Sequence, residues 1–328
     1  MSQRHPYHHA HVHTSTEQRL RFAVVLTVVV LVVEVVAGFL AHSLALLSDA
    51  GHVFTDVFAL LLASFAAGQS ERPADARNTY GYHRTGILTA LANAVTLILV
   101  VLGIAYEAVR RLQHPEAVVP GLMLVAPAIG IAVNMVIAFR LRSDGADLNM
   151  RAALLHVVGD IGASAAVILA AIVILLTGWN IVDPLLSLGI AVVIARGAWR
   201  VLREALSILM EATPPGVNVP ALVADIRRIP EVKGVHDLHV WSIAAGMRAM
   251  SAHVQVHEDC LLSDCDALEG QVRTLLQTRY GIGHSTLQFE CAGCSPNVLY
   301  CSLQAHNHNH TDDAGREAAT ETTEAKAD

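Results

Sequence analysis

Two identical pairs of metal-binding side chains lie within strongly apolar stretches of the sequence. His52 precedes Asp56 by four residues, and His156 precedes Asp160 by the same interval. On an α-helix this interval places the imidazole and the carboxylate on one face, one turn apart. Two imidazole nitrogens and two carboxylate oxygens complete a tetrahedral set for zinc, and two negative charges neutralise the cation in a low-dielectric site. The residues therefore predict an intramembrane site for a divalent cation.

Either pair alone also has a simpler explanation. A membrane Asp can form a hydrogen bond between helices, and a His can be a satisfied core residue. An ionised Asp at the bilayer centre costs at least ~2.5–3.5 kcal/mol on insertion scales, however, and the same spacing recurs on two separate segments. The repetition favours the metal site. Because protons compete with metal for imidazole near neutral pH, such a site is expected to exchange metal for protons.

The composition is that of an integral membrane protein. Of 328 residues, 53% are hydrophobic and 16% charged, and the mean hydropathy is +0.47. Membrane lipids are therefore expected partners, whereas nucleic acid is not, because no basic patch is interleaved with aromatic residues. Six segments are apolar enough to cross a bilayer. We expect these helices near Phe22–Ala41, Leu44–Gly68, Ile87–Val109, Gly121–Leu141, Ala152–Thr177 and Ile181–Leu202.

The distribution of arginines indicates the orientation of these segments. Arginines cluster before the first segment, between the second and third, between the fourth and fifth, and around the end of the sixth. The connections after the first and fifth carry no Arg or Lys; Arg110 and Arg111, at the opposite end of the third, are the exception. We expect a multi-pass protein of the inner (plasma) membrane, and the positive-inside rule predicts that both of its termini lie in the cytoplasm.

After about Glu211 the composition changes to that of a small α+β domain. Pro214, Pro215 and Gly216 mark a linker. A helix is expected over Val219–Ile229, then strands over Gly234–Ile243 and Met247–Val256, a helix over Ser263–Arg279 and a strand over Ser285–Cys291. We predict four regions: a His-rich tail (1–20), a six-helix domain (21–208), a cytoplasmic domain (209–300) and a disordered acidic tail (301–328).

Other buried polar residues have open roles. Asp49 lies three residues before His52, where it either shapes the exit path or caps the helix start. Glu34, in the first apolar segment, is a candidate for a proton or ion path. Asn93 and Asn134 are better explained by hydrogen bonds between helices.

The chain resembles the cation diffusion facilitators, specifically their bacterial zinc-exporting branch. The resemblance covers residues 20 to 295. It is carried by SLALLSDAGHVFTD (43–56), TYGYHR (79–84), HVVGD (156–160), DP (183–184) and VHDLHVW (235–241). It implies a homodimer of six-helix protomers with a cytoplasmic ferredoxin-like domain, which exports zinc in exchange for protons by alternating access. It also implies that His52, Asp56, His156 and Asp160 form the transport site.

Two positions depart from the family pattern. Gly86 stands where the third helix commonly has Glu. Some members carry a further metal site in the loop between the second and third helices; here Asp75 remains, but Asn78 and Tyr82 occupy positions where His is expected. We therefore do not predict a metal site in this loop.

A second, regulatory zinc site is expected in the cytoplasmic domain. His236 and His253 lie on the two arms of the predicted hairpin and could be cross-strand neighbours. The resemblance makes both of them metal ligands, with Glu290 as a third. His284 is a weaker candidate, and His239, on the opposite face of the strand from His236, is better explained by packing.

Cysteines and His-rich tails offer further possible ligands. The five cysteines all follow residue 259, and their odd number argues against a disulfide framework. Cys291 and Cys294 form one CxxC, which is half a zinc site. The tails either gather metal loosely or are inert. Their histidines are His5, His8, His9, His11 and His13 at the start, and His306, His308 and His310 near the end.

The sequence thus predicts a proton-coupled zinc exporter. Cadmium, cobalt or nickel as cargo remains an alternative, because these ions share ligands and geometry with zinc. A membrane-anchored metal sensor is a second alternative, which duplicate ligand pairs within the bilayer disfavour. An intramembrane zinc enzyme is a poor fit, because four protein ligands leave no position for a catalytic water.

Overall fold

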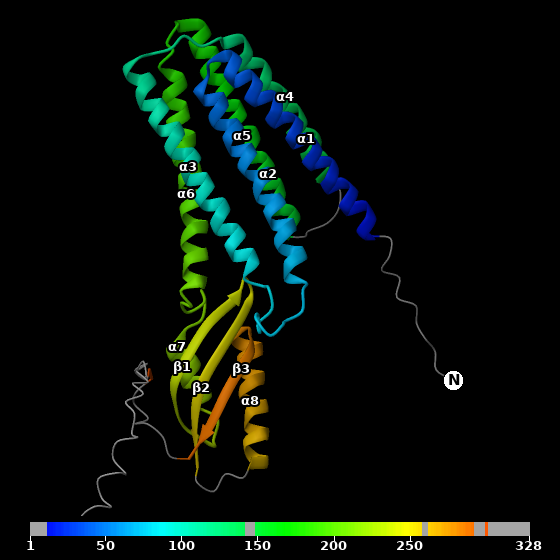
Figure 1. Cartoon of the computed structure of the whole chain (residues 1–328), viewed down its shortest axis with the longest axis vertical. Coiled ribbons are helices and arrows are strands. Elements are labelled where there is room, and N and C mark those ends of the chain that lie inside the picture. The colour runs from blue at the N-terminus through cyan, green and yellow to red at the C-terminus, as the bar shows by residue number, and fades with distance from the viewer. Residues whose placement is uncertain (1–11, 142–147, 258–261, 292–298, 301–328) are drawn as a thin grey trace, which may run out of the picture. The chain divides into compact units, whose positions relative to one another are not determined.

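The computed structural model describes residues 12–141, 148–257, 262–291 and 299–300. Its elements form two compact units, which we describe separately. The first contains six long helices that run side by side (Figure 1). Within the described residues, all six are long and apolar enough to cross a membrane. Their bounds are α1 (Val12–Ala41), α2 (Leu44–Ser70), α3 (Thr85–Gln113), α4 (Pro120–Leu141), α5 (Leu148–Thr177) and α6 (Val182–Leu209).

The predicted fold class is confirmed, and the protein is a multi-pass membrane protein. Several helices extend beyond the predicted apolar segments. The first begins at Val12 rather than Phe22, and the sixth ends at Leu209 rather than Leu202. The physical reason is that hydropathy locates only the membrane-spanning part of a helix, whereas polar turns continue the helix beyond it.

Helix α2 contributes to two apolar clusters of the helical unit. Ala45 and Leu46 pack in a buried cluster with side chains of α1, α4 and α5. Leu44, at the start of the same helix, packs in a second cluster with α3 and α6. The approach of α1 to α2 depends on Gly38, where a Cβ would lie 2.7 Å from Leu47 Cδ2. The helix that carries His52 and Asp56 is therefore held from both sides.

The start of α2 is capped by a carboxylate from α6. Asp183, which is fully buried, accepts hydrogen bonds from Ser43 Oγ (2.6 Å), the Leu44 N–H (2.8 Å) and the Ala45 N–H (3.1 Å). Ser43 Oγ then accepts from the Leu46 N–H at 3.2 Å. These contacts satisfy N–H groups of the first turn that no intrahelical acceptor can reach. The carboxylate also lies at the positive end of the helix dipole.

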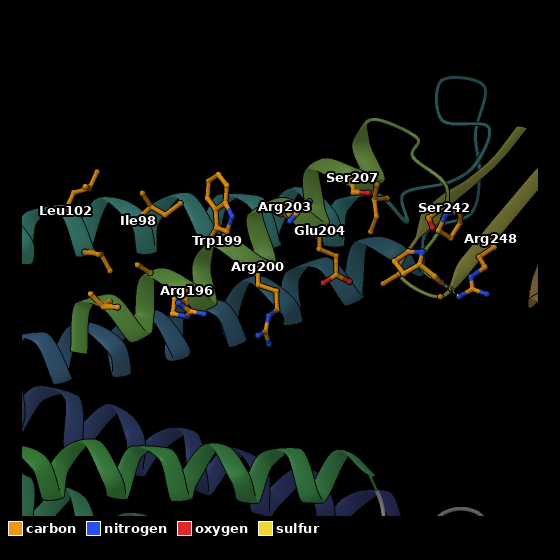
Figure 2. Close-up of a pocket in the computed structure, with 18 residues that line it drawn as sticks. Ile98, Leu102, Arg196, Trp199, Arg200, Arg203, Glu204, Ser207, Ser242 and Arg248 are labelled. Carbon is orange, nitrogen blue, oxygen red and sulfur yellow. Dashed lines mark hydrogen bonds between the residues drawn. The ribbon is translucent and has the colours of Figure 1, made fainter. Parts of the chain in front are cut away.

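Helices α3 and α6 lie side by side, and α6 carries a basic face. Figure 2 shows Arg196, Trp199, Arg200 and Arg203 along α6, among residues that line a pocket. All four side chains are exposed. Because their spacing of three and four residues matches the helical repeat, they occupy one side of the helix.

The second unit has the order α7 (Val219–Ile226), β1 (Val232–Ala244), β2 (Met247–Val256), α8 (Leu262–Tyr280) and β3 (Ile282–Glu290). This is the predicted αββαβ order, and the strands form one sheet in the order β1-β2-β3 (Figure 1). Gly246, at φ +77°, makes the hairpin turn between β1 and β2. Helix α7 ends at Ile226 instead of the predicted Ile229. The backbone N–H groups of Arg228 and Ile229 bond to carbonyls three residues back, which replaces the α-helical pattern there.

A buried acid joins the two helices of this unit. Asp225 in α7 accepts a hydrogen bond from Tyr280 Oη at 2.5 Å, and Arg279 and Arg228 each approach it at 2.6 Å. The hydrogen bond from Tyr280 is the largest cause that lowers the pKa of the Asp225 carboxyl below its usual value of 3.8, and the two guanidinium groups lower it further. The interaction therefore stabilises the fold above pH 3.8 and is lost as the pH falls below it.

Asp183→Ala should lower the stability of the helical unit. The substitution leaves buried N–H groups at the start of α2 without acceptors, and each such group costs ~1–3 kcal/mol. We expect a lower thermal unfolding temperature in detergent, with Asp183→Asn intermediate because it keeps one acceptor oxygen. Thr96→Ala, which removes an exposed hydroxyl bonded within its own helix, is the control. Equal unfolding temperatures for Asp183→Ala and Thr96→Ala would contradict the capping role.

Tyr280→Phe should weaken the docking of α7 on α8. It removes the hydrogen bond that stabilises ionised Asp225, so amide protection in both helices of the full-length protein should fall at neutral pH. The difference from wild type should shrink as the pH drops below 3.8, because Asp225 is then protonated in both proteins. Hydrogen exchange at matched pH measures this effect, with Thr278→Ala on the exposed face of α8 as the control. A difference that does not change with pH would rule out the charged hydrogen bond as its source.

Candidate metal centres

The two His–Asp pairs meet between two helices of the helical unit, where their side chains are partly exposed. His52 and Asp56 come from α2, and His156 and Asp160 come from α5. His52 Nε2 lies 3.8 Å from Asp56 Oδ2 and 3.8 Å from Asp160 Oδ1. His156 Nε2 lies 3.3 Å from Asp56 Oδ2 and 3.9 Å from Asp160 Oδ2. Each imidazole thus faces both carboxylates, one from its own helix and one from the neighbouring helix.

Three of these residues, His52, Asp56 and Asp160, are spaced to hold one small cation; His156 approaches Asp56 but is not in this group, and its ring centroid lies 6.1 Å from that of His52. Ligand atoms bonded to zinc at 2.0–2.2 Å are separated by about 3.3–3.6 Å, which is close to the separations found here. The donor atoms of His52, Asp56 and Asp160 all lie within 4.8 Å of one another. Asp160 Oδ1 and His52 Nδ1 are buried and have no hydrogen-bond partner among the described residues. A carboxylate oxygen in that position is available to a cation.

The two helices are tied together one turn away from this cluster. Ser164 Oγ in α5 donates a hydrogen bond to Asp49 Oδ2 in α2 at 3.2 Å. Both residues are buried, with exposed fractions of 3% and 2%. Of the two explanations that the sequence leaves open for Asp49, capping of the helix start is not what the structure shows, because Asp183 and Ser43 make the cap. Ser164 is a contributor that the sequence analysis did not identify.

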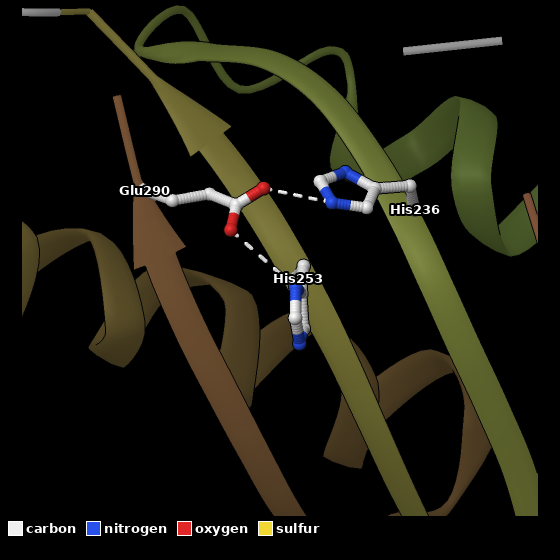
Figure 3. A group of neighbouring side chains, drawn as sticks. All are labelled: His236, His253 and Glu290. Carbon is white, nitrogen blue, oxygen red and sulfur yellow. Dashed lines mark ion pairs between the residues drawn. The ribbon is translucent and has the colours of Figure 1, made fainter. Parts of the chain in front are cut away.

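A second cluster lies in the α+β unit. Figure 3 shows His236 on β1, His253 on β2 and Glu290 at the end of β3 turned toward one another. Glu290 Oε1 lies 2.7 Å from His236 Nε2, and Glu290 Oε2 lies 3.4 Å from His253 Nδ1. The two imidazole rings are 5.2 Å apart between centroids. Two nitrogens and a carboxylate at these separations supply three zinc ligands.

Asp237 is a further residue at this cluster that the sequence analysis missed. Its carboxylate lies 3.7 Å from His253 Nε2 and 3.3 Å from His239 Nε2. Asp237 has φ +48°, and the burial alternation of β1 is interrupted just before it, where Val235 and His236 are both buried. A carboxylate beside the far nitrogen of His253 can fix the orientation of that ring. The sequence HDLH (236–239) contains this carboxylate between two histidines. Regular strand alternation, however, places Asp237 on the opposite face from His236, so the pattern alone does not identify it.

The remaining candidates lie apart from this cluster or outside the described residues. His284 does not belong to it; six residues before Glu290 on β3, it is about 20 Å away along an extended strand. Cys291 is exposed, with Sγ 3.7 Å from the His257 carbonyl oxygen. Cys294, the C-terminal histidines and His5, His8, His9 and His11 lie outside the described residues, whereas His13 falls within the first turn of α1.

The loop between α2 and α3 uses its acid for local structure. Asp75 accepts hydrogen bonds from the backbone N–H groups of Asn78 and Arg77 and from Tyr82 Oη. The backbone hydrogen bond from Asn78, followed by the side-chain hydrogen bond from the Tyr82 hydroxyl, holds the pKa of Asp75 below its usual value. The residues that stand in place of the family's histidines thus bind the carboxylate themselves.

Comparison with known proteins assigns the chain to a family. Residues 20–210 match the model described as the cation efflux transmembrane domain, and residues 214–292 match that of the cation efflux protein cytoplasmic domain. This chain belongs to the cation efflux family. The predicted resemblance is thereby confirmed, and the protein is a cation efflux transporter rather than an enzyme.

Several bacterial relatives are similar to this cation efflux protein over nearly its whole length. The zinc transporter ZitB of Escherichia coli is 38% identical over 315 residues, covering 92% of this chain and 99% of the relative. The cadmium, cobalt and zinc/H⁺-K⁺ antiporter of Bacillus velezensis is 36% identical over 311 residues, covering 93% and 99%. The metal cation efflux system protein CzcD of Cupriavidus metallidurans is 36% identical over 289 residues, covering 87% and 90%.

Glu290→Gln should weaken zinc binding by the α+β unit of this cation efflux protein. In an Asp160→Ala background, which removes one ligand of the intramembrane cluster, the part of the zinc binding that depends on Glu290 reports on the cluster of His236, His253 and Glu290. Loss of the carboxylate should lower the affinity at least ~10-fold. Equilibrium dialysis with metal analysis measures this effect. Glu269→Gln, a carboxylate paired with Arg273 on α8, is the control. Identical binding curves for the two substitutions would exclude Glu290 as a ligand.

Proposed function

We propose that this protein exports zinc from the cytoplasm in exchange for protons, by alternating access to His52, Asp56, His156 and Asp160. The observation that carries the proposal is the convergence of both His–Asp pairs from α2 and α5 into one cluster. The names of the relatives in Escherichia coli and Bacillus velezensis, a zinc transporter and a zinc/H⁺-K⁺ antiporter, support zinc as cargo and a proton as counter-ion.

The ligand chemistry explains how cargo and protons alternate. Imidazole nitrogen and carboxylate oxygen bind zinc only when deprotonated. Four such ligands without thiolates hold the ion less tightly than a structural cysteine site, so the ion can also leave. Protons that arrive from the acidic side displace zinc, and loss of those protons on the other side restores the site. Cadmium, cobalt and nickel are alternative cargoes, and the Bacillus velezensis relative is named for cadmium and cobalt as well.

The orientation follows from the arginines. Arg196, Arg200 and Arg203 lie in the C-terminal half of α6 (Figure 2). Together with the arginines near the loops after α2 and α4, they support cytoplasmic termini and an inner-membrane location. The two arginines that depart from this pattern have local partners. Arg110 and Arg111 form ion pairs with Glu107 and Glu116, and Arg111 also donates to the His42 carbonyl. The domain boundaries at residues 20, 208 and 300 remain predictions.

The second cluster supports regulation by the same ion. Zinc bound at His236, His253 and Glu290 would join the three strands of the sheet and rigidify the α+β unit. The family model that matches residues 214–292 is named for a dimer, which supports a homodimer of this chain. Metal binding that favours one arrangement of the dimer would shift the transport equilibrium toward it.

Zinc uptake into inverted membrane vesicles with an imposed pH gradient tests the function. The wild type should accumulate zinc only when the gradient is present. Asp160→Ala should reduce the rate at least ~10-fold, because it removes one of four ligands. Asp266→Ala, an exposed acid on α8, is the control and should transport normally. If the wild type accumulates neither zinc, cadmium nor cobalt, the transport proposal is wrong and a membrane-anchored metal sensor becomes the better reading.

A further inference from the structure

A second pair of carboxylates is buried beside the intramembrane metal cluster. Glu34 in α1 and Asp49 in α2 have exposed fractions of 1% and 2%. Asp49 accepts a hydrogen bond from Ser164 Oγ in α5, whereas Glu34 Oε2 has no hydrogen-bond partner among the described residues. Neither carboxylate forms an ion pair or hydrogen bond with the four proposed metal ligands among those residues. Their contacts are therefore distinct from those of that site.

A glycine of α4 lies close to Glu34 and to the serine that bonds Asp49. At Gly130 a Cβ would lie 3.0 Å from Glu34 Oε1 and 3.6 Å from Ser164 Oγ. The carboxylate of α1 and the hydroxyl of α5 thus approach the same point on α4, and that hydroxyl reaches on to Asp49 in α2. Glu34 therefore lies where side chains of α1, α2 and α5 meet α4, beside the apolar Val30, and a methyl group added at Gly130 would crowd it.

The charges around this space are almost all negative. The groups whose charges act on Glu34 are Asp49 on α2 and Asp160 on α5. Those that act on Asp49 are His52 on its own helix and Asp160. No Lys or Arg forms an ion pair with either carboxylate among the described residues. Two neighbouring carboxylates without a cation cannot both stay ionised away from water, so the pair must hold a positive charge.

We propose that Glu34 and Asp49 form a proton-binding site, separate from the metal ligands, that releases its proton when zinc binds and takes one up when zinc leaves. The inference rests on the proposed function. A proton is the occupant that fits best, because Gly130 and Val30 crowd Glu34, and the polar groups that meet here are two carboxylates and one hydroxyl. A larger cation requires six or more oxygen ligands, as calcium does, or several waters, as magnesium does.

The coupling is electrostatic and runs along two helices. Asp49 lies one turn from His52 on α2, and Ser164 lies one turn from Asp160 on α5. Zinc at the four ligands adds two positive charges close to the pair, which favours its ionised form; departure of zinc leaves Asp56 and Asp160 uncompensated, which favours the protonated form. The proton of the Glu34 carboxyl then leaves to water, and the pair regains a proton as zinc departs. The protein exchanges more protons per zinc than the four ligands supply alone.

The number of protons released per zinc bound tests this inference. Purified protein in weakly buffered solution is titrated with zinc while a pH indicator records the release. Glu34→Gln keeps the shape of the side chain but cannot ionise, so it should release about one proton fewer per zinc. Asp49→Asn should show the same loss, Glu34→Asp should retain the release, and Asp266→Asn is the control. Zinc transport by Glu34→Gln should also depend less on the imposed pH gradient.

The outcomes separate this inference from the proposed function. If the wild type neither binds nor transports zinc, the proposed function fails. If the wild type transports zinc and both Glu34→Gln and Asp49→Asn release as many protons as it does, the proton site is overturned. Unchanged proton release with potassium-dependent transport that Glu34→Gln abolishes would assign the space to an alkali cation instead and would also overturn it.

A measurement on the unaltered protein covers the case in which the variants do not fold. The zinc-induced infrared difference spectrum of the wild type should show loss of the carbonyl band of a protonated carboxylic acid. That band should be diminished in whichever of Glu34→Gln and Asp49→Asn folds. A wild-type spectrum without the band means that no carboxylic acid loses a proton on zinc binding, and the inference is then wrong.

Discussion

The stability of the helical unit depends on how each carboxylate that is buried away from water is stabilised. Desolvation penalises the charged form so strongly that every buried acid needs a partner or a proton. Asp183 receives backbone and hydroxyl hydrogen bonds at a helix start. Asp56 and Asp160 face imidazoles at distances that admit a cation. Among the described residues, Glu34 and Asp49 have one hydrogen bond from Ser164 between them and no facing imidazole, and they are the pair to which we assign a proton.

These arrangements converge on α2. Its first turn is fixed to α6 by Asp183, its apolar residues enter two apolar clusters, and its polar face carries Asp49, His52 and Asp56 in successive turns. Ser164 of α5 then bonds to Asp49 while Asp160 faces His52. The ligands of the proposed transport site are thus held by packing and hydrogen bonds outside the site, as a preorganised binding site requires.

The sequence predicted the features that are local or periodic. Apolar stretches located the six spans, strand alternation and turn residues located the hairpin, and the interval of four predicted that His52 and Asp56 share a face. It could not predict contacts that depend on how distant segments meet. The bonds from Ser43 to Asp183 and from Ser164 to Asp49 each join residues more than 100 positions apart. Asp237 was missed for another reason, because its left-handed backbone breaks the strand alternation.

The cap at the start of α2 also has a mechanical consequence. A helix fixed at one end can tilt rigidly only about that end, and displacement then grows in proportion to distance from the pivot. At 1.5 Å per residue, His52 and Asp56 lie about 12 and 18 Å from Leu44, whereas Ser70 lies about 39 Å away. A tilt of α2 about Asp183 would therefore move the far end of the helix about two to three times as far as the ligands. The ligands would move about a third to a half as far as the opposite end, so the same tilt changes access at that end more than it displaces the site.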